Sequence, residues 1–316
     1  MPKEQAITTP KPEFTPRDVQ IFKDIYDCGG LTAFQISALH YPLDAPAEKR
    51  VFPIEQPHSN CQRRLLQLYE HGYLERREQP QYPSRGRKEN IHRLSRKGVR
   101  LLAQWLGCPV SDLPYRAQDK NLGVEFLEHL VLTNDVRVSL MLAAPKHHAH
   151  IVTWYTDAYL KRNPLKVTPA TSDGEEKQAN LVPDGYFHLH TDAPEPHDYH
   201  RFLEIDRGTE TGISSKDIYR SWERKVKLYL KYYESGEYTR RFGTRGMCIL
   251  TVTTGEKRLK NLKNVTESAG GVSRFWFTTF DRISSETVLT EPIWRMAGKE
   301  GLYSLIWDKG KMPPRV

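Results

Sequence analysis

The chain has 316 residues, of which 47 are lysine or arginine and 39 are aspartate or glutamate, giving a formal charge of +8. This length exceeds what one hydrophobic core usually supports, so we expect two domains. The excess of positive charge favours a polyanionic partner. We expect a cytoplasmic protein without a membrane partner, because no apolar run reaches the roughly 20 residues of a membrane-spanning helix and the first residues lack the apolar core of a secretory signal. The four cysteines are scattered, which argues against a disulfide framework or a zinc knuckle.

Local signals predict three helices in the first part of the chain. The first starts at Thr15–Pro16, where a capping hydroxyl precedes a proline at the first helical position, and stops at Gly29–Gly30. Thr32 can cap a second, short helix that ends before Pro42. A third helix begins at residue 59 or 60. Two helices joined through a glycine pair fit the start of a helix-turn-helix.

The third expected helix is the candidate recognition helix. Its leucines face inward at helical spacing, which leaves arginine and amide side chains on the outer face. Such side chains can make paired hydrogen bonds with guanine and adenine edges in the major groove. The candidate DNA-reading residues are Asn60, Gln62, Arg63, Arg64 and Gln67. The alternative is an ordinary solvated helix face.

Two short strands, Tyr73–Arg77 and Glu89–Leu94, follow this helix and predict a β-hairpin. The Pro/Gly-rich loop between them carries three cations, Arg85, Arg87 and Lys88. Loop cations suit contacts with backbone phosphates, which position a protein on DNA, while the helix reads the bases. A fourth helix follows Ser95 and runs through Trp105.

This order of helices and hairpin predicts a winged helix-turn-helix over residues 14–107 that binds double-stranded DNA, after a flexible segment at 1–13. Winged helices also serve as protein-interaction modules, and that alternative stays open. The stretch Pro42–Pro57 is longer than the connection of a compact helix-turn-helix. It is either a contact with DNA or a partner, or a tolerated insertion.

A second domain is expected at 122–285, after a linker at 108–121 and before a C-terminal extension at 286–316. Its pattern of helix, three strands, helix, strand, helix and strand predicts an α/β sandwich around a small mixed sheet. The expected helices are 124–142, 216–234 and 256–266, and the expected strands are 151–155, 181–189, 201–206, 247–252 and 275–280.

Acidic residues gather on two of these strands. Asp184 follows Pro183 on one strand, and Glu204 and Asp206 lie on the same side of the next because strand side chains alternate. Three converging carboxylates favour a hard divalent cation, Mg²⁺ or Mn²⁺, which can activate water for phosphodiester hydrolysis. The alternative is that Asp184 is a turn residue and that Glu204 pairs with Arg207 or a helix lysine.

The segments PDGYFHLH and RFLEIDRGTE, a helix with Lys225, Tyr229 and Tyr233, and the strand MCILTVTT resemble the PD-(D/E)xK nuclease-like fold. Together with EHLVLTNDVRVSL at Glu128–Leu140, they resemble more closely the replication-relaxation family. That family couples a winged helix to such a domain and is associated with plasmids and mobile elements. The resemblance covers most of residues 14–280.

The resemblance implies the residues of a metal-dependent nuclease. The implied catalytic set is Asp184, Glu204, Asp206 and Lys225, of which the first two are the metal ligands. Glu125 or Glu128 on the preceding helix could assist. Active nucleases of this fold carry a lysine two residues after the glutamate, where this chain has Asp206. Some of them accept an acid there, and in others the lysine comes from the neighbouring helix, as Lys225 could.

We therefore expect a double-stranded DNA-binding accessory factor of a plasmid or other mobile element, acting in replication, mobilisation or regulation, whose nuclease-like domain need not cleave. One alternative is a Mg²⁺-dependent, site-directed DNA endonuclease. Another is a protein–protein interaction factor that uses both domains as binding modules. The expected partners are double-stranded DNA and replication, mobilisation or recombination proteins, and a homodimer stays open.

Overall fold

The computed structural model describes residues 8–41, 46, 49–79, 89–113, 123–167, 178–193, 196–208 and 215–306. The chain divides into two compact units, Met1–Val138 and Ser139–Val316, called here the N-terminal and C-terminal units. The division falls within the long helix α5 (Val124–Ala143), whereas the sequence analysis placed a linker at 108–121.

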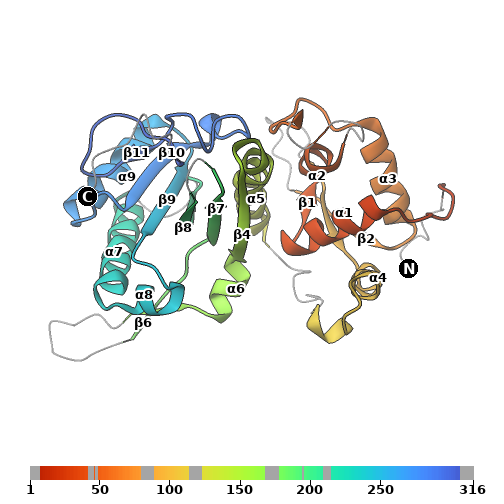
Figure 1. The fold of residues 1–316 in the computed structure, drawn as a ribbon, viewed down its shortest axis with the longest axis horizontal. Coiled ribbons are helices and arrows are strands. Elements are labelled where there is room, and N and C mark those ends of the chain that lie inside the picture. Colours follow the sequence, from red (N-terminus) through yellow and green to blue (C-terminus); the bar gives the residue numbers. More distant parts are fainter. Residues whose placement is uncertain are drawn as a thin grey trace. The chain divides into compact units, whose positions relative to one another are not determined.

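The N-terminal unit combines helices with a small antiparallel sheet in the strand order β1-β3-β2 (Figure 1). Its elements are α1 (Pro16–Asp27), β1 (Leu31–Thr32), α2 (Ala33–His40), α3 (Ser59–Glu70), β2 (Leu74–Arg77), β3 (Ile91–Leu94), α4 (Arg96–Leu106) and the 3₁₀ helix η2 (Val110–Asp112). The four helices and two hairpin strands lie where the sequence predicts them. The additional strand β1 pairs with β3 and precedes α2 directly.

Capping and burial explain the helices of this unit. Asp18 accepts hydrogen bonds from the backbone N–H and the hydroxyl of Thr15, which closes the start of α1. Gly107 ends α4 in the left-handed conformation at φ 65°, which glycine adopts without strain. The core between α1, α3, α4 and the sheet contains Ile21, Phe22, Ile25, Leu65, Leu68, Leu74, Ile91 and Leu102.

The first part of α5 also belongs to the N-terminal unit. The amide of Asn134, 3% exposed, donates to the backbone carbonyls of Cys28 at 3.2 Å and Gly30 at 2.8 Å. Arg137 donates to the carbonyl of Asp27 at 2.8 Å. These bonds tie α5 to the end of α1 and to the glycine turn that follows it. The residue pattern predicts this helix as part of the second domain, because helical periodicity does not show which core a helix face packs against.

The C-terminal unit is built on a six-stranded mixed sheet in the order β11-β10-β9-β8-β7-β4. Its strands are β4 (Ala149–Thr156), β7 (Gly185–Thr191), β8 (His197–Asp206), β9 (Met247–Thr253), β10 (Phe275–Thr279) and β11 (Arg295–Met296). The pairs β8–β9 and β9–β10 are parallel, and the other pairs are antiparallel. A separate two-stranded sheet joins β5 (Leu165–Val167) and β6 (Ala179–Leu181).

The single strand expected at 181–189 is wrong. The structure ends β6 at Leu181 and begins β7 at Gly185, and the two strands belong to different sheets. Pro183 lies in the break, where the absence of an N–H donor favours the interruption of a strand. The segment expected as a C-terminal extension also contributes to the fold, because β11 pairs with β10 and Trp294 is fully buried.

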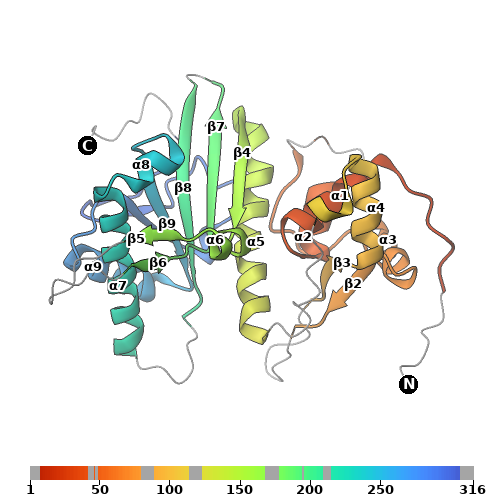
Figure 2. The same cartoon turned by 90° about the horizontal axis from the view of Figure 1, so that it is seen from below.

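Helices α7 (Ser215–Glu234) and α9 (Glu256–Ser268) lie side by side against one face of this sheet (Figure 2). The shorter helices of the unit are α6 (Asp157–Arg162) and α8 (Glu237–Phe242). Buried side chains of both long helices pack on the sheet: Val226, Tyr229, Leu259 and Leu262 against Phe202, Ile249, Phe275 and Phe277. Within the part of the chain that the structure describes, no helix is long and apolar enough to cross a membrane.

Candidate DNA interface and carboxylate site

The first turns of α3 carry an exposed polar face. Asn60, Gln62 and Arg63 are exposed, whereas Cys61 and Leu65 are buried on the opposite side. The guanidinium of Arg63 donates to the side chain of Asn60 at 3.1 Å along the surface. The geometry thus brings together three of the five helix residues that the sequence suggested for DNA reading.

The other two candidates, Arg64 and Gln67, are held inside the N-terminal unit. Arg64 forms two hydrogen bonds with the carboxylate of Asp18, from Nε at 2.9 Å and from Nη2 at 2.8 Å. It also donates to the side-chain oxygen of Gln67 at 2.6 Å, and the Gln67 amide donates to the carbonyl of Pro10 at 2.8 Å. Arg64 is 17% exposed and the Asp18 side chain is 3% exposed. This network fixes α3 to α1, because a two-pronged guanidinium–carboxylate pair is geometrically specific.

The three cations expected in the wing, Arg85, Arg87 and Lys88, lie outside the described residues. The strands that lead into this connection are well defined, with Leu74 opposite Leu94 and Arg77 opposite Ile91. The first of these strands, β2, packs against α3.

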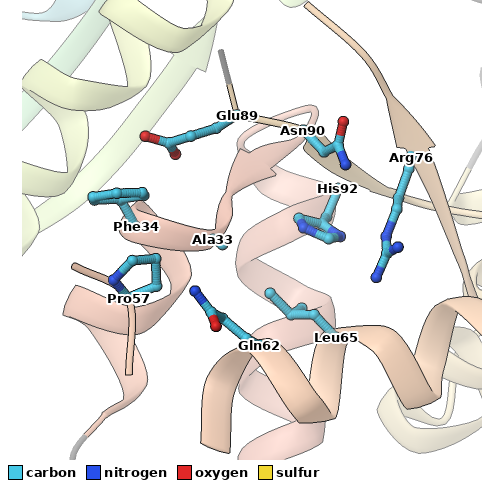
Figure 3. Close-up of a pocket in the computed structure, with 9 residues that line it drawn as sticks. All are labelled: Ala33, Phe34, Pro57, Gln62, Leu65, Arg76, Glu89, Asn90 and His92. Atoms are coloured by element: carbon cyan, nitrogen blue, oxygen red, sulfur yellow. The ribbon is translucent and has the colours of Figure 1, made fainter. Parts of the chain in front are cut away.

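A hollow of about 380 Å³ lies between α3 and the sheet of the same unit (Figure 3). We call it the α3–β3 pocket. The lining residues are Ala33, Phe34, Pro57, Gln62, Leu65, Arg76, Glu89, Asn90 and His92. The sequence does not predict this pocket, because Glu89 and His92 belong to a strand pattern and nothing in that pattern indicates a cavity.

Burial shifts the pKa values of two side chains that line this pocket, His92 and Glu89. His92 is 5% exposed, and burial together with the charge of Arg76 lowers its pKa to about 4, so the imidazole is neutral at pH 7. Burial raises the pKa of Glu89, although hydrogen bonds from Thr32 and from the backbone of Phe34 oppose the change. The guanidinium of Arg76 lies over the ring of Tyr69 on α3, 4.2 Å from its centroid.

In the C-terminal unit, Glu204 on β8 meets two donors from α7. Lys225 and Tyr229 are four residues apart on this helix and therefore lie on one face. Lys225 donates to Oε2 of Glu204 and Tyr229 donates to Oε1. The Glu204 side chain is 4% exposed and that of Lys225 is 29% exposed. The residue two positions after Glu204 on β8 is Asp206, and a lysine from helix α7 reaches the glutamate.

Asp184 completes this carboxylate site at the start of β7. Its Oδ2 accepts from the backbone N–H of Ile205 at 2.8 Å, and its own N–H donates to the carbonyl of Leu203 at 3.1 Å. Burial raises the pKa of Glu204 to about 7, and the Asp184 charge adds to the rise, while the Lys225 ammonium opposes it. Burial lowers the pKa of Lys225, but the two carboxylates outweigh it and the net pKa is raised.

Asp206, two residues after Glu204, has charged and polar partners of its own. It lies in an ion pair with Arg258 of α9, whose Nε and Nη2 donate to the two carboxylate oxygens at 2.6 Å each. The hydroxyl of Thr253 also donates to it. The structure thus brings together Asp184, Glu204 and Lys225, and gives Asp206 to a neighbouring pair.

The carboxylate site as arranged does not fit a divalent cation. Both oxygens of Glu204 already accept hydrogen bonds, one of them from an ammonium group. Among the described residues, no group of three His, Cys, Asp or Glu side chains could hold a metal ion. Of the two helix glutamates suggested as helpers, Glu128 belongs to the N-terminal unit, and the side chain of Glu125 is outside the described residues.

A helical unit with a small antiparallel sheet, followed by a mixed α/β unit with a buried glutamate–lysine pair, defines a two-unit α/β protein. The chain belongs to the replication-relaxation family, whose family model matches residues 22–246. The match extends from α1 through α8 and confirms the family that the sequence motifs indicated. No curated protein and no solved structure matches the chain.

Proposed function

We propose that this protein binds double-stranded DNA through a winged helix-turn-helix formed by the N-terminal unit, as an accessory factor of a plasmid or other mobile element. The observation that carries the proposal is the exposed polar face of α3. Asn60, Gln62 and Arg63 present amide and guanidinium groups at the start of a helix whose other face is buried. Such a helix start suits the base edges of the major groove.

Arg64 and Gln67 have a positioning role in this proposal. Their network with Asp18 holds α3 against α1, so the exposed face meets DNA without first being ordered. Preorganisation of this kind reduces the entropy lost on binding. The base contacts are therefore assigned to Asn60, Gln62 and Arg63.

The wing supplies phosphate contacts through Arg85, Arg87 and Lys88. In the sequence, these cations belong to the connection between β2 and β3. Together with the formal charge of +8, they predict an affinity that falls steeply as salt rises, because binding releases counterions from DNA.

For the C-terminal unit we propose a PD-(D/E)xK-like fold that binds DNA or a partner protein without cleaving DNA. The supporting observation is that Lys225 and Tyr229 occupy both oxygens of Glu204. The partners we propose are replication, mobilisation or recombination proteins. Self-association into a homodimer is compatible with this role.

A Mg²⁺- or Mn²⁺-dependent endonuclease is the second candidate function. The convergence of Asp184, Glu204 and Lys225 favours it, because two carboxylates and a lysine are the side chains that the nuclease motif requires. This function would need Lys225 to withdraw from Glu204 so that a cation could bind the two carboxylates. Its chemistry would be metal-assisted hydrolysis of a phosphodiester.

Two measurements on the full-length protein test these functions. Fluorescence anisotropy with a duplex of mixed sequence, repeated across a salt series, should show binding with a log-linear salt dependence. Absence of affinity in dilute salt would contradict DNA binding and leave the protein-interaction alternative.

Incubation with supercoiled plasmid and Mg²⁺ or Mn²⁺ separates the binder from the enzyme. We expect no metal-dependent nicking. Nicking by the wild type that Glu204→Ala abolishes, while the exposed-site variant Glu223→Ala retains it, would establish the endonuclease instead.

A further inference from the structure

Three residues that line the α3–β3 pocket each carry a buried polar side-chain atom that lacks a hydrogen-bond partner among the described residues. These atoms are Nδ1 of His92, Nε of Arg76 and Oε2 of Glu89. Figure 3 shows the His92 ring directed into the hollow, between Ala33 of α2 and Leu65 of α3. A buried polar group without a partner is costly, and three side chains that carry one line this hollow.

Opposite charges stand on different walls of the pocket. Figure 3 shows Glu89 and Arg76 on either side of His92, with Glu89 near Phe34 and Arg76 directed towards α3. A phosphate would meet the Glu89 carboxylate, and a simple cation would meet the Arg76 guanidinium. A neutral molecule with hydrogen-bond acceptors on one edge and donors on another satisfies both walls.

The remaining walls suit a flat heterocycle. Phe34, Pro57 and Leu65 are apolar, and the amides of Gln62 and Asn90 each offer a donor and an acceptor. A volume of about 380 Å³ lies within the range of small-ligand pockets, which are mostly apolar with a few convergent polar groups.

We propose that the α3–β3 pocket binds a guanine base. Guanine presents the acceptors O6 and N7 on one edge, which suit the donors of Arg76. Its N1–H and 2-amino groups are donors, which suit the carboxylate of Glu89. Adenine has an amino donor in place of O6 and an acceptor at N1, so it would turn a donor towards Arg76 and an acceptor towards Glu89.

Occupancy of this pocket would act on the proposed DNA-reading face. Gln62 lines the pocket and also belongs to the exposed face of α3. Glu89 and Asn90 precede β3 at the end of the wing connection. A bound base therefore contacts both elements assigned to DNA, from a free nucleoside or from a guanine displaced from a DNA strand.

The test is isothermal titration of the full-length protein with guanosine, with adenosine, and with oligothymidylates that carry one central dG or one central dA. We expect guanosine or the dG oligonucleotide to bind at least tenfold more tightly than its adenine counterpart. Tighter binding of guanosine assigns the pocket to a free nucleoside, and tighter binding of the oligonucleotide assigns it to a DNA base.

Glu89→Gln should reduce the preference for guanine over adenine at least tenfold, because an amide lacks the charged acceptor for both guanine donors. The matched control is Glu75→Gln on β2, which changes a glutamate of the same sheet that is not part of the pocket lining. Circular dichroism confirms that each variant is folded.

Equal affinity for the two bases, no saturable binding at millimolar ligand, or an unchanged preference in Glu89→Gln would each overturn this inference. Binding of guanosine in the pocket does not require binding of duplex DNA. A protein that bound guanosine but no duplex would lose the proposed function and retain the pocket assignment.

Discussion

The start of α3 and the carboxylate site on β8 both contain a buried ion pair. The first pair leaves the neighbouring polar side chains exposed, whereas the second occupies the carboxylate of its site. In the N-terminal unit, the Asp18–Arg64 pair lies on the inner side of α3 and leaves Asn60 and Arg63 exposed. In the C-terminal unit, the Glu204–Lys225 pair occupies the carboxylate itself. The Asp18–Arg64 pair therefore orients the exposed face of α3. The Glu204–Lys225 pair instead occupies the carboxylate that a metal ion would need.

The largest effect should come from breaking the C-terminal pair. Lys225→Met leaves the Glu204 carboxylate buried without its cation, so we expect a loss of about 3–5 kcal/mol in the free energy of unfolding at pH 8. The matched control is Lys227→Met on the same helix, where an exposed pair with Glu223 should contribute less than about 0.5 kcal/mol. Urea denaturation measures both. Similar losses in the two variants would show that the Glu204–Lys225 pair is not a buried one.

The Glu204–Lys225 pair also predicts that the free energy of unfolding depends on pH. The pKa of Glu204 is raised to about 7 in the folded protein, above its ordinary value of 4.5, so the folded state holds this proton more tightly. The Glu204 contribution to stability should therefore fall as pH rises from about 4.5 to 7. Urea midpoints of wild type and Glu204→Gln, compared between pH 5 and 7.5, isolate this contribution. Parallel pH profiles for the two proteins would contradict the assignment.

The N-terminal pair should give the next largest effect. Arg64→Ala should destabilise the protein by about 2–3 kcal/mol, less than the general range for buried pairs, because Thr15 still donates to Asp18. Its exposed neighbour provides the control, since Arg63→Ala should change the unfolding free energy by less than about 0.5 kcal/mol. If Arg64→Ala were as stable as Arg63→Ala, Arg64 would be available for DNA and its positioning role would be wrong.

A smaller and more specific effect is expected at the exposed face of α3. With a duplex selected from a random pool by the full-length protein, Arg63→Ala should lose about 1–3 kcal/mol of binding free energy, the range for one paired base contact. Binding to unselected DNA should change much less. Arg100→Ala, an exposed arginine on α4, is the control. An equal loss on selected and unselected DNA would assign Arg63 to phosphate contacts.

The smallest effect per residue is expected from the wing. Replacing Arg85, Arg87 and Lys88 together by alanine should weaken binding to selected and unselected DNA alike. The slope of log affinity against log salt should become shallower by roughly three, since each phosphate contact adds about 0.9. An unchanged slope would remove the wing cations from the DNA interface.

Most of the local structure, and the family, could be predicted from the order of residues alone. Thr15, the glycine pair at 29–30 and Ser95 mark helix ends through capping and backbone freedom, which depend on near neighbours in the chain. Strand alternation likewise put Glu204 and Asp206 on one face of β8. These features could be predicted because their causes lie within a few residues.

The long-range partners of these residues became known from the folded structure. Arg64 meets Asp18 across 46 positions of the chain, Asp206 meets Arg258 across 52, and Asn134 reaches the end of α1 across more than 100. The α3–β3 pocket likewise combines residues of two helices and two segments of the sheet. Side-chain pairing over such separations depends on how faces pack and how much water they exclude, and no local pattern of residues encodes that.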